Sequence, residues 1–175
     1  MVFLNFKKHY FFGKEHEEFI INNIKCMEIT VQKLIDKKEM LSFHPLIKQL
    51  YPSLSAEDYS IQLDDMIPFR YSQVGVFEGH KKIGMAGVWI GHKFWCGKYL
   101  EIDHVVVLET HRSQGIGKLI FDFLKNMARE EGCLSLGLDS FTHNHRSHKM
   151  FFKEDFVIKG YHFVHALEES KMRSF

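Results

Sequence analysis

The sequence predicts a single α/β domain in which helices flank a mixed sheet, with the element order β-αα-βββ-α-β-α-β. Segments that alternate apolar and polar residues are interleaved with segments of helical spacing, which predicts strands and helices in turn. No repeat and no linker rich in proline, glycine or serine divides the 175 residues. With 45% apolar residues, a chain of this length is expected to bury one core and form one domain.

Composition argues against several classes of protein. The 23 Lys and Arg residues nearly balance the 22 Asp and Glu residues, so no overall basic field attracts nucleic acid or an anionic membrane. The 3 cysteines are an odd number without a C-x-x-C pair, which argues against a disulfide framework or a zinc ribbon. No run approaches the ~18 apolar residues of a membrane span. We therefore expect a cytoplasmic protein without a nucleic-acid or membrane partner.

The elements of the first half follow from local signals. Residues 1–25 are expected to be an N-terminal extension, and the domain is expected over residues 26–175. Alternation predicts strands, and polar N-cap residues predict helix starts. The signals are an alternating strand at Met27 to Val31, helix starts at Asp36 and Ser55, a stop at Pro68, and antiparallel strands at Val74 to Phe77 and Ile83 to Ile90.

The second half predicts a central strand followed by two helices and two strands. Leu100 to Leu108 begins by alternating and ends as a continuous β-branched run, which is typical of a strand covered on both faces. The later elements are a helix that follows Gly117 and ends at Gly132, a strand over Leu134 to Leu138, a helix from about Asn144 to Glu154, and a last strand from Phe156 to about Ala166. Asp139 is expected to leave its strand on the face opposite the leucines.

The turn from Arg112 to Gly117 is the feature most suggestive of function. It lies between a buried strand and an amphipathic helix, where N–H groups of the helix start can converge on an anion. Glycine lets the main chain approach a phosphate without a Cβ clash. The spacing matches neither a Walker loop nor the dinucleotide fingerprint. From these residues alone, an ordinary strand-to-helix turn with no ligand is equally open.

This turn resembles the acetyl-CoA signature of the GNAT N-acetyltransferase superfamily, Arg/Gln-x-x-Gly-x-Gly/Ala after a valine-rich strand. Arg112, Gly115 and Gly117 match it position by position, and Asn144 to Phe156 is similar to a second motif of the family. The resemblance runs from about Met27 to Phe156. It implies a GNAT domain with a mostly antiparallel mixed sheet, an acyltransferase activity, and acetyl-CoA as cosubstrate without a metal.

The resemblance also implies which residues hold the coenzyme. Main-chain groups of the strand would pair with the pantetheine arm and the acetyl carbonyl, and N–H groups of the turn would hold the pyrophosphate beside the cation of Arg112. The strand residues are Val105, Val106 and Val107, the turn residues are Ser113, Gln114, Gly115, Ile116, Gly117 and Lys118, and Asn144 would contact the coenzyme from the next helix.

Acyl transfer to an amine needs a group that removes the ammonium proton. Glu101 and Asp139 are the candidate catalytic residues, because relatives carry a base at similar places, and Asp103 and His104 are second choices. Strict alternation would put Glu101 and Asp103 on one face and His104 on the other unless the strand contains a bulge. We expect direct attack by the amine in a ternary complex.

The chain departs from the family where many relatives carry a tyrosine as general acid, because this position is Phe151. A water, Tyr161 or His148 would have to replace it. A catalytically weak acyl-CoA-binding or sensing module is therefore the alternative function. The histidines at 143, 145 and 148 lack the spacing of a helical metal site, and we expect no metal there.

The acceptor is expected to be a primary amine of a small molecule or a peptide, and the sequence does not identify it further. The tail after Phe156 is short for the two closing strands of the family. A neighbouring subunit or the N-terminal extension would then cover the open sheet edge, so a homodimer is a further expectation.

Overall fold

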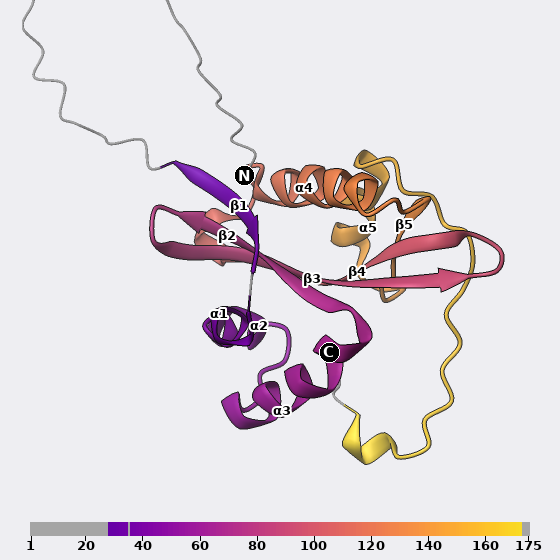
Figure 1. The fold of residues 1–175 in the computed structure, drawn as a ribbon, viewed down its shortest axis with the longest axis horizontal. Helices are drawn as coiled ribbons and strands as arrows, with labels where there is room; N and C mark the ends of the chain where they lie inside the picture. Colours follow the sequence, from indigo (N-terminus) through magenta and orange to yellow (C-terminus); the bar gives the residue numbers. More distant parts are fainter. Residues whose placement is uncertain (1–27, 35, 173–175) are drawn as a thin grey trace, which may run out of the picture.

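A computed structural model describes residues 28–34 and 36–172, so the expected N-terminal extension over residues 1–25 lies outside the described residues. The described part forms one sheet of five strands in the order β1-β2-β3-β4-β5, in which the first four are antiparallel and β5 runs parallel to β4 (Figure 1). The strands are β1 (Ile29–Lys33), β2 (Tyr71–Glu78), β3 (Lys81–Lys93), β4 (Gly97–Val107) and β5 (Ser135–Leu138). The predicted mixed, mostly antiparallel α/β fold is confirmed.

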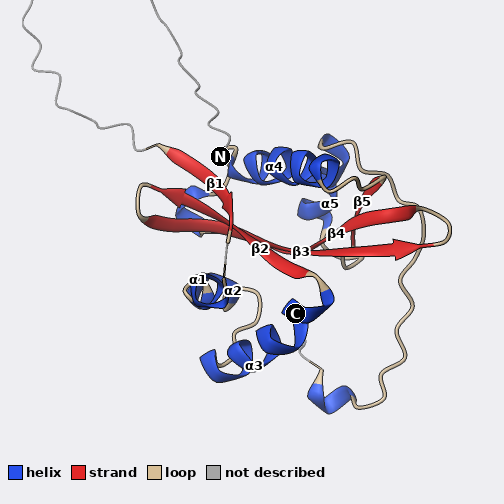
Figure 2. Cartoon of the chain, in the orientation of Figure 1, coloured by secondary structure: helices blue, strands red, loops and turns tan. Residues whose placement is uncertain are grey.

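Helices cover both faces of the sheet (Figure 2). The first face carries α1 (Lys37–Leu41), α2 (His44–Ile47) and α3 (Ala56–Met66), and the second carries α4 (Ile116–Glu130) with α5 (His145–Lys153). Short 3-10 turns are η1 (Ile67–Phe69), η2 (Glu109–His111) and η3 (Glu169–Lys171). No helix within residues 28–34 and 36–172 has the length and apolar character needed to cross a membrane.

Side-chain caps fix three helix starts where the sequence predicts them. Asp36 accepts from the N–H of Glu39 at 2.9 Å, and Ser55 accepts from the N–H of Asp58 at 2.9 Å. Asn144 caps α5 in the same way. The structure has three helices between β1 and β2 where the sequence predicts two, because Pro45 sits in the first turn of α2, where its missing N–H costs nothing and a helix restarts.

Two apolar clusters pack on the two faces of the sheet. Ile120, Phe121 and Leu124 of α4 pack on one face, while Phe43 and Leu63 belong to the cluster under α1 to α3. All five side chains are buried. Each face therefore buries its own apolar layer, and burial of this kind contributes most of the stability of such a sandwich.

Two expectations about strands are wrong. The run from Phe156 to Ala166 forms no strand, because β5 offers an edge of only four residues and Gly160 interrupts the run. Side chains of that run are exposed, as Phe163 shows at 90%. The strand predicted to be central, β4, is fourth of five in the sheet, and β3 is the middle strand.

Candidate active site

A β-bulge lies in β4 at the centre of the candidate site. Met85 pairs with Val106 and Gly87 pairs with Asp103, so Ala86 of β3 faces two residues of β4. The extra residue brings His104 to the same face as Asp103, the face that α1 to α3 cover. The strand therefore contains the bulge that strict alternation leaves out, and His104 does not lie on the opposite face.

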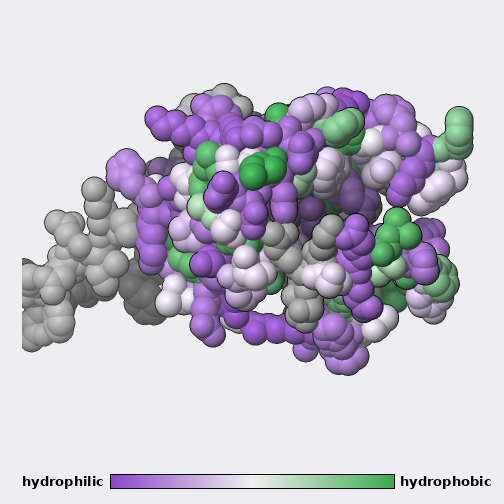
Figure 3. Space-filling model, turned by 90° about the horizontal axis from the view of Figure 1, so that it is seen from below, coloured by the Kyte–Doolittle hydropathy of each residue, from purple (hydrophilic) through white to green (hydrophobic). Residues whose placement is uncertain are grey.

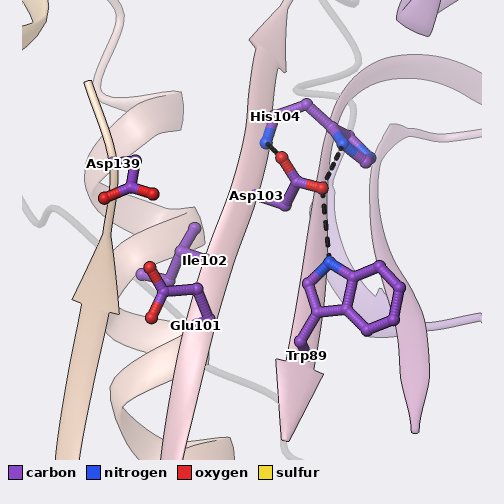
Figure 4. A pocket seen from close by; sticks show the side chains of 6 residues that line it. All are labelled: Trp89, Glu101, Ile102, Asp103, His104 and Asp139. Atoms are coloured by element: carbon purple, nitrogen blue, oxygen red, sulfur yellow. Dashed lines mark hydrogen bonds and ion pairs between the residues drawn. The ribbon is translucent and has the colours of Figure 1, made fainter. Parts of the chain in front are cut away.

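Asp103 is held by three donors next to the bulge (Figure 4). Nδ1 of His104 lies 3.2 Å from Oδ2, Nε1 of Trp89 donates to the same oxygen at 3.4 Å, and the N–H of His104 donates to Oδ1 at 2.9 Å. Burial alone would raise the pKa of Asp103, but these bonds and the neighbouring imidazole lower it to about 2. Asp103 therefore stays ionised throughout the working pH range.

A buried polar chain continues from His104 beneath α3. Nε2 of His104 lies 2.8 Å from the hydroxyl of Tyr71, and Nε2 of Gln73 donates to the hydroxyls of Tyr71 and Tyr59 at 2.9 and 2.7 Å. Burial raises the pKa of Tyr59 to about 12 and that of Tyr71 as well, so both stay protonated. The sequence does not connect Tyr71 or Gln73 with His104, because only the folded sheet brings them together.

The two predicted catalytic residues, Glu101 and Asp139, lie on one cavity of about 270 Å³ together with Asp103. Glu101 is half-buried opposite Gly137 of β5, and a Cβ at Gly137 would lie 2.6 Å from its Oε2. Burial and the negative charge of Asp139 raise the pKa of Glu101. Asp139 follows β5, is exposed, and has Oδ2 2.7 Å from Nδ1 of His162. The cavity thus concentrates negative charge.

The turn before α4 leaves its main-chain donors open. Ser113 and Gly115 have φ of 62° and 85°, and no side chain caps the helix. The first four N–H groups of a helix lack intrahelical acceptors. A Cβ at Gly115 would meet nothing within 4 Å, and one at Gly117 would meet only Sδ of Met150 at 3.0 Å. These features fit the pyrophosphate of acetyl-CoA.

The polar side chains of this turn are engaged locally. Nε of Arg112 donates to the carbonyl of Val107 at 3.3 Å, and Nε2 of Gln114 donates to that of Thr110 at 2.9 Å. Nζ of Lys118 lies 3.0 Å from Asp122. Ile116 is buried, so only its main chain is available to an anion.

The edge of β4 beyond Ile102 also has main-chain groups that are available for hydrogen bonds to a ligand. β5 pairs with β4 only from Tyr99 to Ile102, so no strand of the described part of the chain lies beside Val105 to Val107 on that side. A pantetheine arm, with its two amides, fits such an edge in the manner of an added strand. Asn144, the remaining predicted contact, uses its side chain to accept from the N–H of Ser147 at 3.3 Å.

The suggested replacements for the missing tyrosine do not line the acidic cavity. Phe151 packs edge-to-face against Phe121 and Phe156, Tyr161 is exposed in the tail, and His148 lies against His145. Within the described part of the chain, no group of three or more His, Cys, Asp or Glu residues is placed to hold a metal ion.

Known proteins resemble this chain over most of its length. The model of the Acetyltransferase (GNAT) family matches residues 40–156. An uncharacterised N-acetyltransferase of Bacillus subtilis, YhdJ, is 25% identical over 137 residues, covering 77% of this chain and 96% of the relative.

Two solved structures share the fold. The aminoglycoside N-acetyltransferase AAC(6')-Iy in complex with CoA has a TM-score of 0.71 at 16% identity, over 81% of this chain and 95% of that one. Glucosamine-6-phosphate N-acetyltransferase from Arabidopsis thaliana has a TM-score of 0.63 at 23% identity, over 81% of this chain and 99% of that one.

Proposed function

We propose that this chain, which belongs to the GNAT acetyltransferase family, moves acetyl from acetyl-CoA to a primary amine in a ternary complex. The family model matches residues 40–156, so the chain is an acyltransferase. The observation that carries the proposal is the convergence of Glu101, Asp103 and Asp139 on one cavity beside the bulge in β4. Neighbours named aminoglycoside acetyltransferases favour a small-molecule acceptor over a peptide.

We assign the coenzyme to the side of the sheet edge and α4. Main-chain groups of Val105 to Val107 pair with the pantetheine arm, and N–H groups from Ser113 to Lys118 hold the pyrophosphate next to Arg112. The side chain of Asn144 is committed to its own helix, so its contact with the coenzyme would run through the main chain or follow a rearrangement of this cap. The thioester of bound acetyl-CoA supplies the acyl carbon that the amine attacks.

The three carboxylates have different roles in binding and deprotonating the amine. An alkylammonium has a pKa of about 10.4 and must lose a proton before it attacks. Asp103 supplies a permanent negative charge that attracts the ammonium, and Glu101, with its raised pKa, takes the proton. Asp139 acts through Glu101 by raising that pKa.

The covalent step then balances without a redox partner. The lone pair of the amine forms the N–C bond, the C–S bond breaks, and its electron pair leaves on sulfur as a thiolate. The nitrogen then loses its remaining surplus proton to this thiolate, which gives the amide and free CoA. A thiol with a pKa near ~8.5 is an adequate leaving group without an acid. This is consistent with Phe151, which has no proton to donate and lies among Phe121 and Phe156.

The proposal is tested by the release of free CoA from acetyl-CoA in the presence of a panel of primary amines and peptides. We expect turnover with at least one small-molecule amine. Binding of acetyl-CoA by calorimetry without turnover on any acceptor would favour the alternative, a weakly catalytic acyl-CoA-binding module, for which Phe151 is the motivating residue. Absence of both binding and turnover would contradict the proposal.

A further inference from the structure

A second cavity lies beside the acidic one, on the face of the sheet that α1 to α3 cover. Its volume of about 400 Å³ is in the range of small-molecule pockets, roughly 300–1,000 Å³. Its walls come from α2, α3, the turn between them and β2, and include Ile47, Tyr51, Leu54, Tyr59, Met66 and Tyr71. Figure 3 shows this side of the molecule, where the outer surface is largely hydrophilic. The apolar walls thus contrast with the surface around them.

The tyrosine rings make these walls more apolar than their composition suggests. The hydroxyl of Tyr59 is bonded to Gln73, and the hydroxyl of Tyr71 is bonded to Gln73 and to Nε2 of His104. Both residues are buried. Their polar ends are therefore satisfied within the protein, and a ligand in the cavity meets mainly ring carbons.

The two cavities meet at Asp103 and His104, which line both of them. Among the described residues that line the second cavity, Asp103 is the one carboxylate, Gln62 is a neutral amide, and none is Lys or Arg. The carboxylate of Asp103 at the junction can therefore pair with one positive charge of a ligand, and the other described residues of that cavity offer no second carboxylate. Beyond the junction, an unpaired charge would have to be buried against apolar walls, which is costly.

We infer that the acceptor is a monoamine on a compact apolar or aromatic body, such as an arylalkylamine. Its ammonium lies at Asp103 within reach of Glu101, and its body fills the cavity between α2, α3 and β2. This inference rests on the proposed amine acetyltransferase activity and specifies its substrate class. A polyamine would bring a second ammonium against the apolar walls, and a sugar phosphate would find no cation there.

The first test compares kcat/KM for 2-phenylethylamine, spermidine and glucosamine 6-phosphate, with free CoA as the readout. We expect 2-phenylethylamine to be preferred by on the order of tenfold or more, because the other two leave a charge unpaired. Equal or better turnover of spermidine or the sugar phosphate would overturn the substrate class and leave the proposed activity intact. No turnover with any amine would overturn the activity and the inference with it.

The second test introduces a carboxylate into the apolar wall of the second cavity. Met66→Glu at the end of α3 is expected to lower kcat/KM for 2-phenylethylamine by on the order of tenfold, while KM for acetyl-CoA stays unchanged. The same change is expected to raise turnover of spermidine relative to 2-phenylethylamine, since a second carboxylate now meets its second ammonium. The matched control is Ile61→Glu, at an exposed position of the same helix, which should change neither value.

Folding is monitored by thermal unfolding of each variant. If Met66→Glu does not fold, Gln62→Glu replaces it, because this nearly isosteric change puts a carboxylate on the same cavity. A loss that is equal for all amines, or one shared by Ile61→Glu, would overturn the inference. A shift in preference from 2-phenylethylamine towards spermidine would support it.

Discussion

At the scale of single residues, two carboxylates on one strand have pKa values shifted in opposite directions. Burial and the charge of Asp139 raise the pKa of Glu101, while the donors around Asp103 lower its pKa to about 2. Groups whose environments separate their pKa values are suited to different roles. The pair is therefore suited to the proposed roles, in which Glu101 takes a proton and Asp103 supplies a charge that does not titrate in the working range.

This division predicts a pH profile. Glu101 must be deprotonated to act as a base, so kcat/KM should fall as the pH falls through its raised pKa and should level off above it. Glu101→Gln is expected to lower kcat by roughly 10²- to 10⁴-fold and to remove this acidic limb. Asp103→Asn is the comparison: it should raise KM for the amine and leave the limb in place. An unchanged limb in Glu101→Gln would exclude Glu101 as the base.

The sequence located these candidates only in part. Glu101 and Asp139 were identified through the family resemblance, because relatives carry catalytic groups at similar places, and the structure places both on one cavity. The position of His104 could not be predicted, because a single extra residue in β4 moves it to the other face. The sequence does not indicate that Gln73 belongs to the hydrogen-bond chain, since its partners lie on α3 and at the start of its own strand.

At the scale of elements, the close approach of β3 to the bulge depends on Gly87. A Cβ there would lie 2.5 Å from Cε1 of His104 and 2.7 Å from the hydroxyl of Tyr71, and hydrogen bonds hold both groups in place. Gly87→Ala is expected to lower the free energy of unfolding by about 2 kcal/mol and to impair turnover through displacement of His104.

Denaturant unfolding measures this effect, and Gly160→Ala is the control, because its Cβ would meet nothing within 4 Å. The control should leave both stability and turnover nearly unchanged. Equal stability of Gly87→Ala and the natural chain would show that the bulge tolerates a side chain at this point.

Helix starts were the most predictable elements, because a cap depends on residues three apart. The last strand was mispredicted, because the apolar and aromatic residues of the run after Phe156 say nothing about whether a partner edge of sufficient length exists. The break between α1 and α2 depends on Pro45 within the first turn, which the capping signal at Asp36 does not reveal.

At the scale of the whole molecule, the coenzyme side and the acceptor side are encoded differently. The proposed coenzyme side consists of main-chain donors at α4 and the edge of β4, and such a site would leave glycines at fixed spacing in the sequence. The proposed acceptor side joins residues as distant as Ile47 and Asp103, so it leaves no motif. The homodimer and the role of residues 1–25 stay predictions.

The central claim is that the start of α4 binds the pyrophosphate of acetyl-CoA through main-chain N–H groups, and calorimetric titration with acetyl-CoA tests it most directly. Gly117→Ala is the matched control, because its Cβ meets only the flexible Sδ of Met150. Gly117→Asp adds a negative charge where the phosphates are expected.

We expect Gly117→Asp to raise the Kd for acetyl-CoA by on the order of tenfold or more, which corresponds to about 1.4 kcal/mol, with thermal stability close to that of Gly117→Ala. The same Kd for both variants, or a loss of binding that only follows a loss of folding, would contradict the account.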